Sequence, residues 1–331
     1  MDDDFRENES ENLRNCPEDY PEKLSDNEIE QRFRQLLGDF KQPSVPLDIE
    51  IREEENFNGI IRQKIEYNVD FGERISAYHL FQEDLSSDAP GVLSLHGHGG
   101  DEIFPVGKLF HAEPDKKNPM QYSYIAALKG FRVLAPDALG FGERQTEWGS
   151  TSHFPDEVNI QNELTSKGRS LAWKSVWDNS RAIEVLKTLG AETTGVIGWS
   201  GGSTQAYILA AANQKVEAAA CLFSFLTLRH QFYRYRLYHC FYHFIPGMMQ
   251  AGIDWDQVVS LIPPRKIFMA WGGADKGTPE PMYRSFVQSI RNRQNRIGAT
   301  DCLTLYEEPE NNHEITMEML DTAFEFLRES L

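Results

Sequence analysis

The sequence predicts an α/β fold, a mostly parallel, doubly wound sheet that starts with antiparallel strands. Short apolar runs, typical of buried parallel strands, alternate with helical segments through most of the chain. The region before them alternates apolar and polar residues, as half-buried antiparallel strands do. With 331 residues, 40% of them hydrophobic and 25% charged, the chain is large enough to bury one extended core of this class.

Residues 1–24 are predicted to be an acidic, disordered tail. Twelve acidic and only three basic residues occur among the first 30, and such a segment cannot bury enough apolar surface to offset its ordering entropy. Ser25 begins an N-cap signature that leads into apolar residues at helical spacing, and Gly38 ends it. We therefore expect a helical extension over residues 25–45, docked on a catalytic domain over 46–331.

The alternating region from Pro46 to Glu83 predicts the antiparallel start of the sheet. Buried strands are predicted at Gly91–Leu95, Phe131–Ala135, Thr194–Gly198, Val216–Phe223, Lys266–Trp271 and Leu303–Tyr306. Helices are predicted at Ser170–Leu189, Ser203–Ala212 and Met317–Leu327. In such a sheet ligands bind beyond the carboxyl ends of the strands, so chemical groups are expected directly after strands.

Composition excludes several classes of partner. The net charge of −18 repels nucleic-acid phosphates and anionic membrane surfaces. The four cysteines form no C-x-x-C pair, the N-terminus has no secretory pattern, and no apolar stretch reaches the length of a membrane span. We expect a cytoplasmic protein that acts on a small molecule. The sequence is compatible with a homo-oligomer but does not determine the oligomeric state.

The strand predicted at Thr194–Gly198 runs into the motif G-x-S-x-G at Gly198–Gly202, followed by a predicted helix. Strand, motif and helix together are typical of a nucleophile elbow, a strained turn that lifts a serine hydroxyl out of the sheet. Ser200 is the predicted nucleophile. The alternative interpretation is a structural or phosphate-binding glycine turn.

A serine needs a histidine to accept its proton and a carboxylate to orient that histidine. Asp275 follows the strand Lys266–Trp271, and His313 follows the strand Leu303–Tyr306, which gives the chain order Ser, acid, His. The competing residues are Asp254, Asp256, Asp301, His230, His239 and His243. We prefer Asp275 as the orienting acid, because it lies in a loop directly after a strand. We prefer His313 as the base, because the rival histidines lie in an aromatic segment that favours packed or solvated rings.

An oxyanion intermediate needs backbone donors that are already in place. Gly201, next to the serine, is the first candidate, and the backbone N–H of His98, in the glycine-rich loop after Gly91–Leu95, is the second. The H-G-H sequence in that loop has no cysteine or carboxylate at ligand spacing, so no metal and no cofactor are expected.

These motifs resemble those of bacterial α/β-hydrolases of the dienelactone-hydrolase-like, acetyl-xylan-esterase-related group. The residues that carry the resemblance are L-H-G-H-G-G at 95–100, A-P-D-x-x-G-F-G-E-R at 135–144, G-R-S at 168–170, W-D-x-x-R-A at 177–182 and G-W-S-G-G at 198–202. The resemblance covers the chain from about Asp48 onward. It implies the α/β-hydrolase fold and a triad of Ser200, Asp275 and His313, with serine where dienelactone hydrolases proper carry cysteine.

An aromatic segment, about 228–252, follows the strand after the elbow, where this fold commonly inserts a lid. It is either a buried helix pair or a wall of the substrate pocket. The candidate pocket residues are Trp199, Tyr235, Tyr238, Phe241 and Tyr242. Asp137 and Arg144 are interpreted as structural turn residues.

The expected function is a metal-independent serine esterase that cleaves a carboxylic ester, lactone or acetyl ester of a small molecule through an acyl-enzyme. Because the sequence identifies the nucleophile and not the leaving group, cleavage of an amide or carbon–carbon bond by the same triad is an alternative. A noncatalytic binding protein of the same fold is another.

Overall fold

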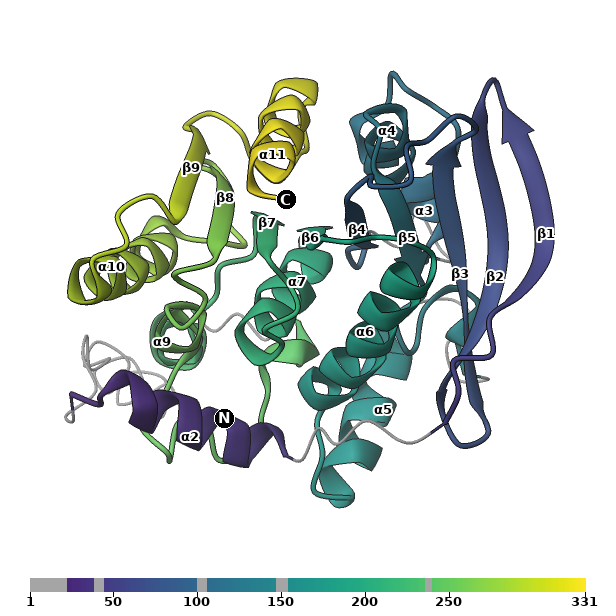
Figure 1. Ribbon diagram of the computed structural model, residues 1–331. Coiled ribbons are helices and arrows are strands. Elements are labelled where there is room, and N and C mark those ends of the chain that lie inside the picture. The colour runs from purple at the N-terminus through teal and green to yellow at the C-terminus, as the bar shows by residue number, and fades with distance from the viewer. Residues whose placement is uncertain (1–22, 39–44, 100–105, 147–153, 236–239) are drawn as a thin grey trace, which may run out of the picture.

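The computed structural model describes residues 23–38, 45–99, 106–146, 154–235 and 240–331. Its centre is a nine-stranded sheet with helices on both faces (Figure 1). Residues 1–22, most of the predicted acidic tail, lie outside the described residues.

The strand order is β1-β2-β3-β5-β4-β6-β7-β8-β9. The strands are β1 (Glu50–Phe57), β2 (Ile60–Asp70), β3 (Glu73–Gln82), β4 (Gly91–Leu95), β5 (Arg132–Pro136), β6 (Thr194–Trp199), β7 (Ala218–Leu222), β8 (Lys266–Gly272) and β9 (Leu303–Glu308). The pairings β1–β2, β2–β3 and β3–β5 are antiparallel, and all pairings from β5 to β9 are parallel. The predicted fold class and the antiparallel start of the sheet are therefore confirmed.

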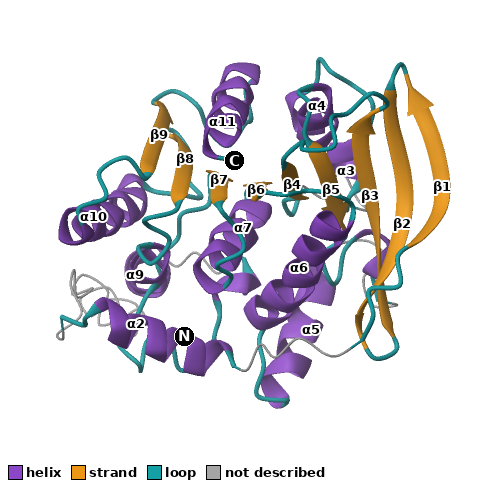
Figure 2. Ribbon diagram, in the orientation of Figure 1, coloured by secondary structure: helices purple, strands orange, loops and turns teal. Residues whose placement is uncertain are grey.

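Helices pack on both faces of the sheet, and more of them lie on one face than on the other (Figure 2). Apolar side chains of α6, α7, α9 and α10 form one buried cluster with the sheet, and those of α4 and α11 form the other. The main helices are α2 (Asp26–Leu37), α3 (Leu109–Ala112), α4 (Tyr122–Leu128), α5 (Phe154–Ser166), α6 (Leu171–Thr188), α7 (Gly201–Ala212), α8 (Leu228–His230), α9 (Trp255–Val259), α10 (Glu280–Ile297) and α11 (Met317–Ser330). Both clusters meet at the central strands, so those strands are buried on both sides.

Most boundaries agree with the sequence pattern within two or three residues, and the differences are local. The helix after the elbow begins at Gly201 instead of Ser203, because the turn passes directly from strand to helix. β1 lies within the antiparallel region predicted at Pro46–Glu83, but the sequence pattern did not give its bounds, and helices α4, α5, α9 and α10 were not predicted. β1 is a charged edge strand with almost no buried side chain, so it lacks the alternation that identifies a half-buried strand.

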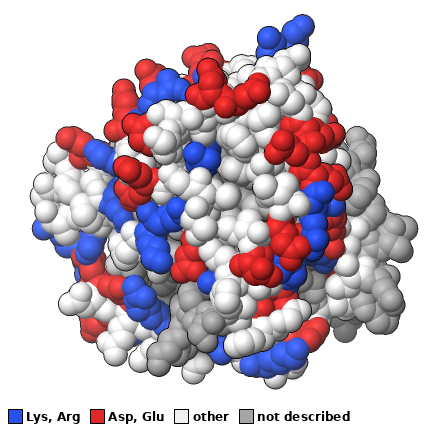
Figure 3. All heavy atoms as spheres, turned by 45° about the vertical axis from the view of Figure 1, so that its right-hand side comes forward, with Lys and Arg blue, Asp and Glu red and all other residues white. Residues whose placement is uncertain are grey.

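Charged residues protect this edge of the sheet. Arg52 pairs with Glu66, and Arg62 pairs with Glu55, across β1 and β2. Figure 3, turned so that this side comes forward, shows basic and acidic side chains interspersed over the surface. Charges on an edge strand disfavour pairing with a second sheet.

Helix α2 begins with a full capping box between Ser25 and Glu28. Its apolar face is buried against the domain: Phe33 is 1% exposed and meets the ring of Trp255 edge-on, with ring centroids 6.0 Å apart. The helix thus packs beside α9, far from β1 (Figure 1).

No helix among the described residues is long and apolar enough to cross a membrane.

Replacing the buried ring on α2 tests how much this extension stabilises the domain. Phe33→Ala is expected to lower the free energy of unfolding by about 3 kcal/mol, because it removes a buried aromatic side chain and leaves a cavity. Arg34→Ala on the exposed side of the same helix should change it by about 0.5 kcal/mol or less. Urea unfolding followed by circular dichroism measures both, and equal values for the two variants would contradict the docking role of α2.

Candidate active site

Ser200 lies between the end of β6 and the start of α7. Its backbone has φ 55° and ψ −119°, a conformation that a residue with a side chain adopts only under strain. Two backbone hydrogen bonds hold the turn: Ser200 N donates to Leu222 O at 2.9 Å, and Thr204 N donates to Ser200 O at 3.1 Å. The side chain therefore stands at the carboxyl end of the sheet, as a nucleophile elbow requires.

The elbow packs directly on the loop after β4. A Cβ atom on Gly202 would lie 2.0 Å from Leu95 O, and one on Gly97 would lie 2.8 Å from Trp199 O. These distances are shorter than any real carbon–oxygen contact, so both positions require glycine. The candidate oxyanion donors, Gly201 and His98, consequently come from two backbone segments in mutual contact.

Asp275 and His313 form a hydrogen-bonded pair at the same edge of the sheet. His313 Nδ1 lies 2.7 Å from Asp275 Oδ2, and Gly277 N donates to Asp275 Oδ1 at 2.7 Å. Asp275 is buried, whereas the side chain of His313 is 32% exposed. Because an ionised carboxylate only accepts, Nδ1 carries the proton and Nε2 is left as the basic nitrogen.

Aromatic contacts place His313 beside the elbow. Trp199 Nε1 donates to His313 O at 3.2 Å, and the two rings are 5.4 Å apart. The ring of Phe223, just after β7, lies 4.9 Å from the His313 ring. Within the described residues Ser200 Oγ makes no hydrogen bond to His313, a contact that tightens in many enzymes only when substrate binds.

His98 makes two further contacts at the elbow. Its Nε2 lies 3.0 Å from Oε1 of Glu157, a buried residue on α5. A Cβ on Gly201 would lie 2.2 Å from His98 Nδ1, so the imidazole rests on the Gly201 backbone. Glu157 is a site residue that the sequence pattern did not identify: it is 59 positions from His98, on a helix that was not predicted.

The candidate pocket residues lie in different surroundings. Trp199 is at the elbow, and the ring of Tyr242 lies 6.0 Å from that of His98. Phe241 packs edge-on against Phe244, and the tilted ring of Tyr235 lies 6.4 Å from that of His230. Tyr238 lies outside the described residues. The site therefore brings together Ser200, Gly201, His98, Trp199, Asp275, His313 and Tyr242.

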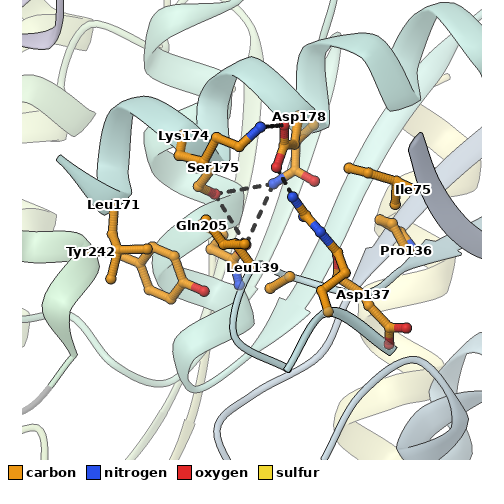
Figure 4. Close-up of a pocket in the computed structure, with 13 residues that line it drawn as sticks. Ile75, Pro136, Asp137, Leu139, Leu171, Lys174, Ser175, Asp178, Gln205 and Tyr242 are labelled. Carbon is orange, nitrogen blue, oxygen red and sulfur yellow. Dashed lines mark hydrogen bonds and ion pairs between the residues drawn. The ribbon is translucent and has the colours of Figure 1, made fainter. Parts of the chain in front are cut away.

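Tyr242 also lines a small buried cavity, whose free volume of about 10 Å³ has room for about one water molecule (Figure 4). The cavity wall is largely polar. It comprises Ile75, Pro136, Asp137, Ala138, Leu139, Arg144, Leu171, Lys174, Ser175, Asp178, Asn179, Gln205 and Tyr242. This space is too small for a substrate, so Tyr242 on this side supports the scaffold.

Asp137 and Arg144 make structural contacts around that cavity. Asp137 accepts hydrogen bonds from Lys108 N at 2.6 Å and Lys108 Nζ at 2.5 Å. Arg144 pairs with Asp178 at 2.9 Å and Glu73 at 2.7 Å. These charges of opposite sign join the loop after β5 to α6 and to the β2–β3 hairpin.

The aromatic segment consists, in its described part, of short turns and is not a helix pair. α8 (Leu228–His230) continues into one π-helical turn at Gln231–Tyr235, and a 3-10 turn follows at Phe241–His243. Arg229 is buried and reaches Asp254 at 3.0 Å and Asp256 at 2.7 Å. These ion pairs tie the segment to α9.

Comparisons with known proteins agree with this architecture. No family model matches the chain. A protein of Bacillus subtilis (strain 168), YtaP, which is described as a proposed hydrolase, is 25% identical over 277 residues, covering 82% of this chain and 88% of that protein.

Two solved structures are similar over nearly the whole chain. A proposed acetyl xylan esterase of Bacteroides fragilis NCTC 9343 has a TM-score of 0.71 and 15% identity, covering 96% of this chain and 87% of that one. Acetyl xylan esterase 1 of Thermoanaerobacterium sp. JW/SL YS485 has a TM-score of 0.61 and 17% identity, covering 96% of this chain and 98% of that one. The chain shares the fold of these structures.

His230, in the aromatic segment, leads us to expect that the stability of the fold depends on pH. Burial, reinforced by the nearby Arg229 charge, lowers the pKa of His230 to about 4. The unfolded chain binds this proton near pH 6.5, so stability is fully present above that pH and is lost as the pH falls from 6.5 towards 4.

We expect the free energy of unfolding to fall less steeply between pH 7 and 4.5 in His230→Gln than in the wild type. The two curves should differ in this interval by about 1–3 kcal/mol, as the pKa shift implies. Urea titrations at several pH values measure the difference. Parallel curves would mean that His230 titrates alike in both states.

Proposed function

We propose that this chain with the α/β-hydrolase fold is a serine hydrolase that cleaves a carboxylic ester, lactone or acetyl ester of a small molecule. The observation that carries the proposal is the hydrogen-bonded pair of Asp275 and His313, held by Trp199 beside the strained turn of Ser200. The names of the similar solved structures, which include acetyl xylan esterases, support the choice of ester over other carbonyl substrates.

Ser200 supplies the nucleophilic oxygen in this mechanism. His313 Nε2 accepts the serine proton while Oγ attacks the ester carbonyl, and Asp275 stabilises the imidazolium that forms. The backbone N–H groups of Gly201 and His98 bind the oxygen that becomes negatively charged.

The intermediate then collapses to an acyl-enzyme. The bond between the carbonyl carbon and the alcohol oxygen breaks, and the imidazolium gives its proton to the departing alcohol. Water repeats the sequence: His313 removes its proton, the hydroxide oxygen adds to the acyl carbon, and Ser200 leaves with the proton. Apart from the ester and this water molecule, these steps use only side chains and backbone donors of this chain.

A fluorophosphonate test of the nucleophile is the first experiment. Intact-protein mass spectrometry should show one adduct on the wild type and none on Ser200→Ala, because only an activated serine displaces fluoride. Ser285→Ala on the exposed surface of α10 is the matched control and should be labelled like the wild type. A folded wild type without an adduct would favour a noncatalytic binding protein.

Turnover of p-nitrophenyl acetate, butyrate and octanoate then measures activity and acyl size. Ser200→Ala should lower kcat by about 10⁴-fold or more, since the other triad members act only through the nucleophile. Full activity in this variant would contradict the assignment. Matched anilides, assayed beside the esters, separate ester from amide cleavage.

A further inference from the structure

The loop after β4 forms buried side-chain hydrogen bonds, although its predicted role needs only one backbone N–H. Two histidine side chains of the loop, His96 and His98, are each buried and each hydrogen-bonded to a different part of the fold. Neither side chain has a role in the chemical steps above. The His96 side chain contacts the carbonyl of the peptide group between Gly97 and His98, and the N–H of that group belongs to His98.

His96 holds the carbonyl side of that peptide. Ala138 N donates to His96 Nε2 at 3.1 Å, so this nitrogen is the acceptor. The other nitrogen, Nδ1, therefore carries the proton and donates to Gly97 O at 2.9 Å. Burial lowers the pKa of His96, which keeps the ring neutral and able to accept and donate at once.

The orientation of the carbonyl determines that of the N–H. In a trans peptide the C=O and the N–H point in opposite directions in one plane. By holding Gly97 O, His96 therefore directs the N–H of His98 to the opposite side of the same plane.

Glu157 holds the other end of the residue. Its carboxylate can only accept, so His98 Nε2–H donates to it across 3.0 Å, with both side chains at most 4% exposed. The ring is also confined by the Gly201 backbone and by the ring of Phe141, 5.7 Å away. The hydrogen bond fixes the direction of the imidazole, and the two neighbouring groups limit its rotation.

We propose that Glu157 is a positioning residue: through the His98 imidazole it fixes the backbone N–H of His98 at the place where the ester oxygen becomes negative. This inference rests on the proposed function. Glu157 touches no reacting atom. It acts on the transition state only, because the oxyanion needs this donor more than the neutral ester does.

Four variants test the proposal. Glu157→Ala removes the acceptor, Glu157→Asp withdraws it by one methylene group, and Glu157→Gln keeps an oxygen at the same reach without the charge. Glu163→Ala is the matched control, since the exposed Glu163 lies on the same helix and forms an ion pair with Lys167.

Glu157→Ala should lower kcat about 10- to 100-fold with KM within about twofold of the wild type, because a donor displaced by about 1 Å loses transition-state stabilisation. Its affinity for a trifluoromethyl ketone, which mimics the oxyanion, should fall by the same factor as kcat/KM. Glu157→Gln should keep kcat within about threefold of the wild type, Glu157→Asp should lie between Gln and Ala, and Glu163→Ala should be unchanged.

A folded Glu157→Ala variant whose kcat stays within twofold of the wild type would overturn the proposal. A rise in KM with an unchanged kcat would also overturn it. If that variant does not fold, the order of the other two decides. A higher kcat in Glu157→Gln than in Glu157→Asp supports the proposal, and the reverse order overturns it. If the wild type shows neither ester turnover nor a fluorophosphonate adduct, the proposed function itself is rejected. If the wild type and Glu157→Ala are equally active, only the role of Glu157 is rejected.

Discussion

The contact between the serine elbow and the loop after β4 is the constraint on which the site depends. Parallel pairing aligns Leu95 with Gly198, so the two strands end side by side and their following turns must share the same small space. They share it only because Gly97 and Gly202 carry no Cβ. A larger residue at either position pushes apart the backbones that bear the proposed nucleophile and the proposed oxyanion donors. Because protein interiors are close-packed, the surrounding residues have no free space to accommodate such a shift.

Glycines allow the same close approach of two loops after β8 and β9. A Cβ on Gly272 would lie 2.4 Å from Asn311 O, and one on Gly273 would lie 2.5 Å from Pro309 O. The loop of Asp275 and the loop of His313 are therefore in backbone contact. Because the backbones are so close, the two side chains can form their 2.7 Å hydrogen bond. Glycines at strand ends thus allow each half of the site to form, and the parallel sheet brings the halves to one edge.

Buried charges join the layers around this core. Lys108 with Asp137, and Arg144 with Asp178, link the loop after β5 to its neighbours, while Arg229 links the aromatic segment to α9. Buried ion pairs are weak evidence for added stability, because desolvation offsets most of the attraction. Their geometry is specific, however, and each pair here sets the place of one loop. The charged A-P-D-x-x-G-F-G-E-R motif is thereby explained as structure, with chemistry left to the elbow and to the loops of Asp275 and His313.

The sequence by itself determined the features that depend on neighbouring residues. Apolar runs located most strands, and Ser25 and Ser170 marked helix starts. The order of Ser200, Asp275 and His313, each in the segment after a strand, indicated which side chains to examine. Only the tertiary structure decided the partnership of Glu157 with His98, the tie of Arg229 to α9 and the existence of the charged strand β1. Those features arise from contacts between residues that are 59, 25 and 14 positions apart in the sequence. No local periodicity or spacing predicts such contacts. Local physics specifies the elements and their ends, whereas long-range contacts between buried polar groups depend on how the sheet assembles.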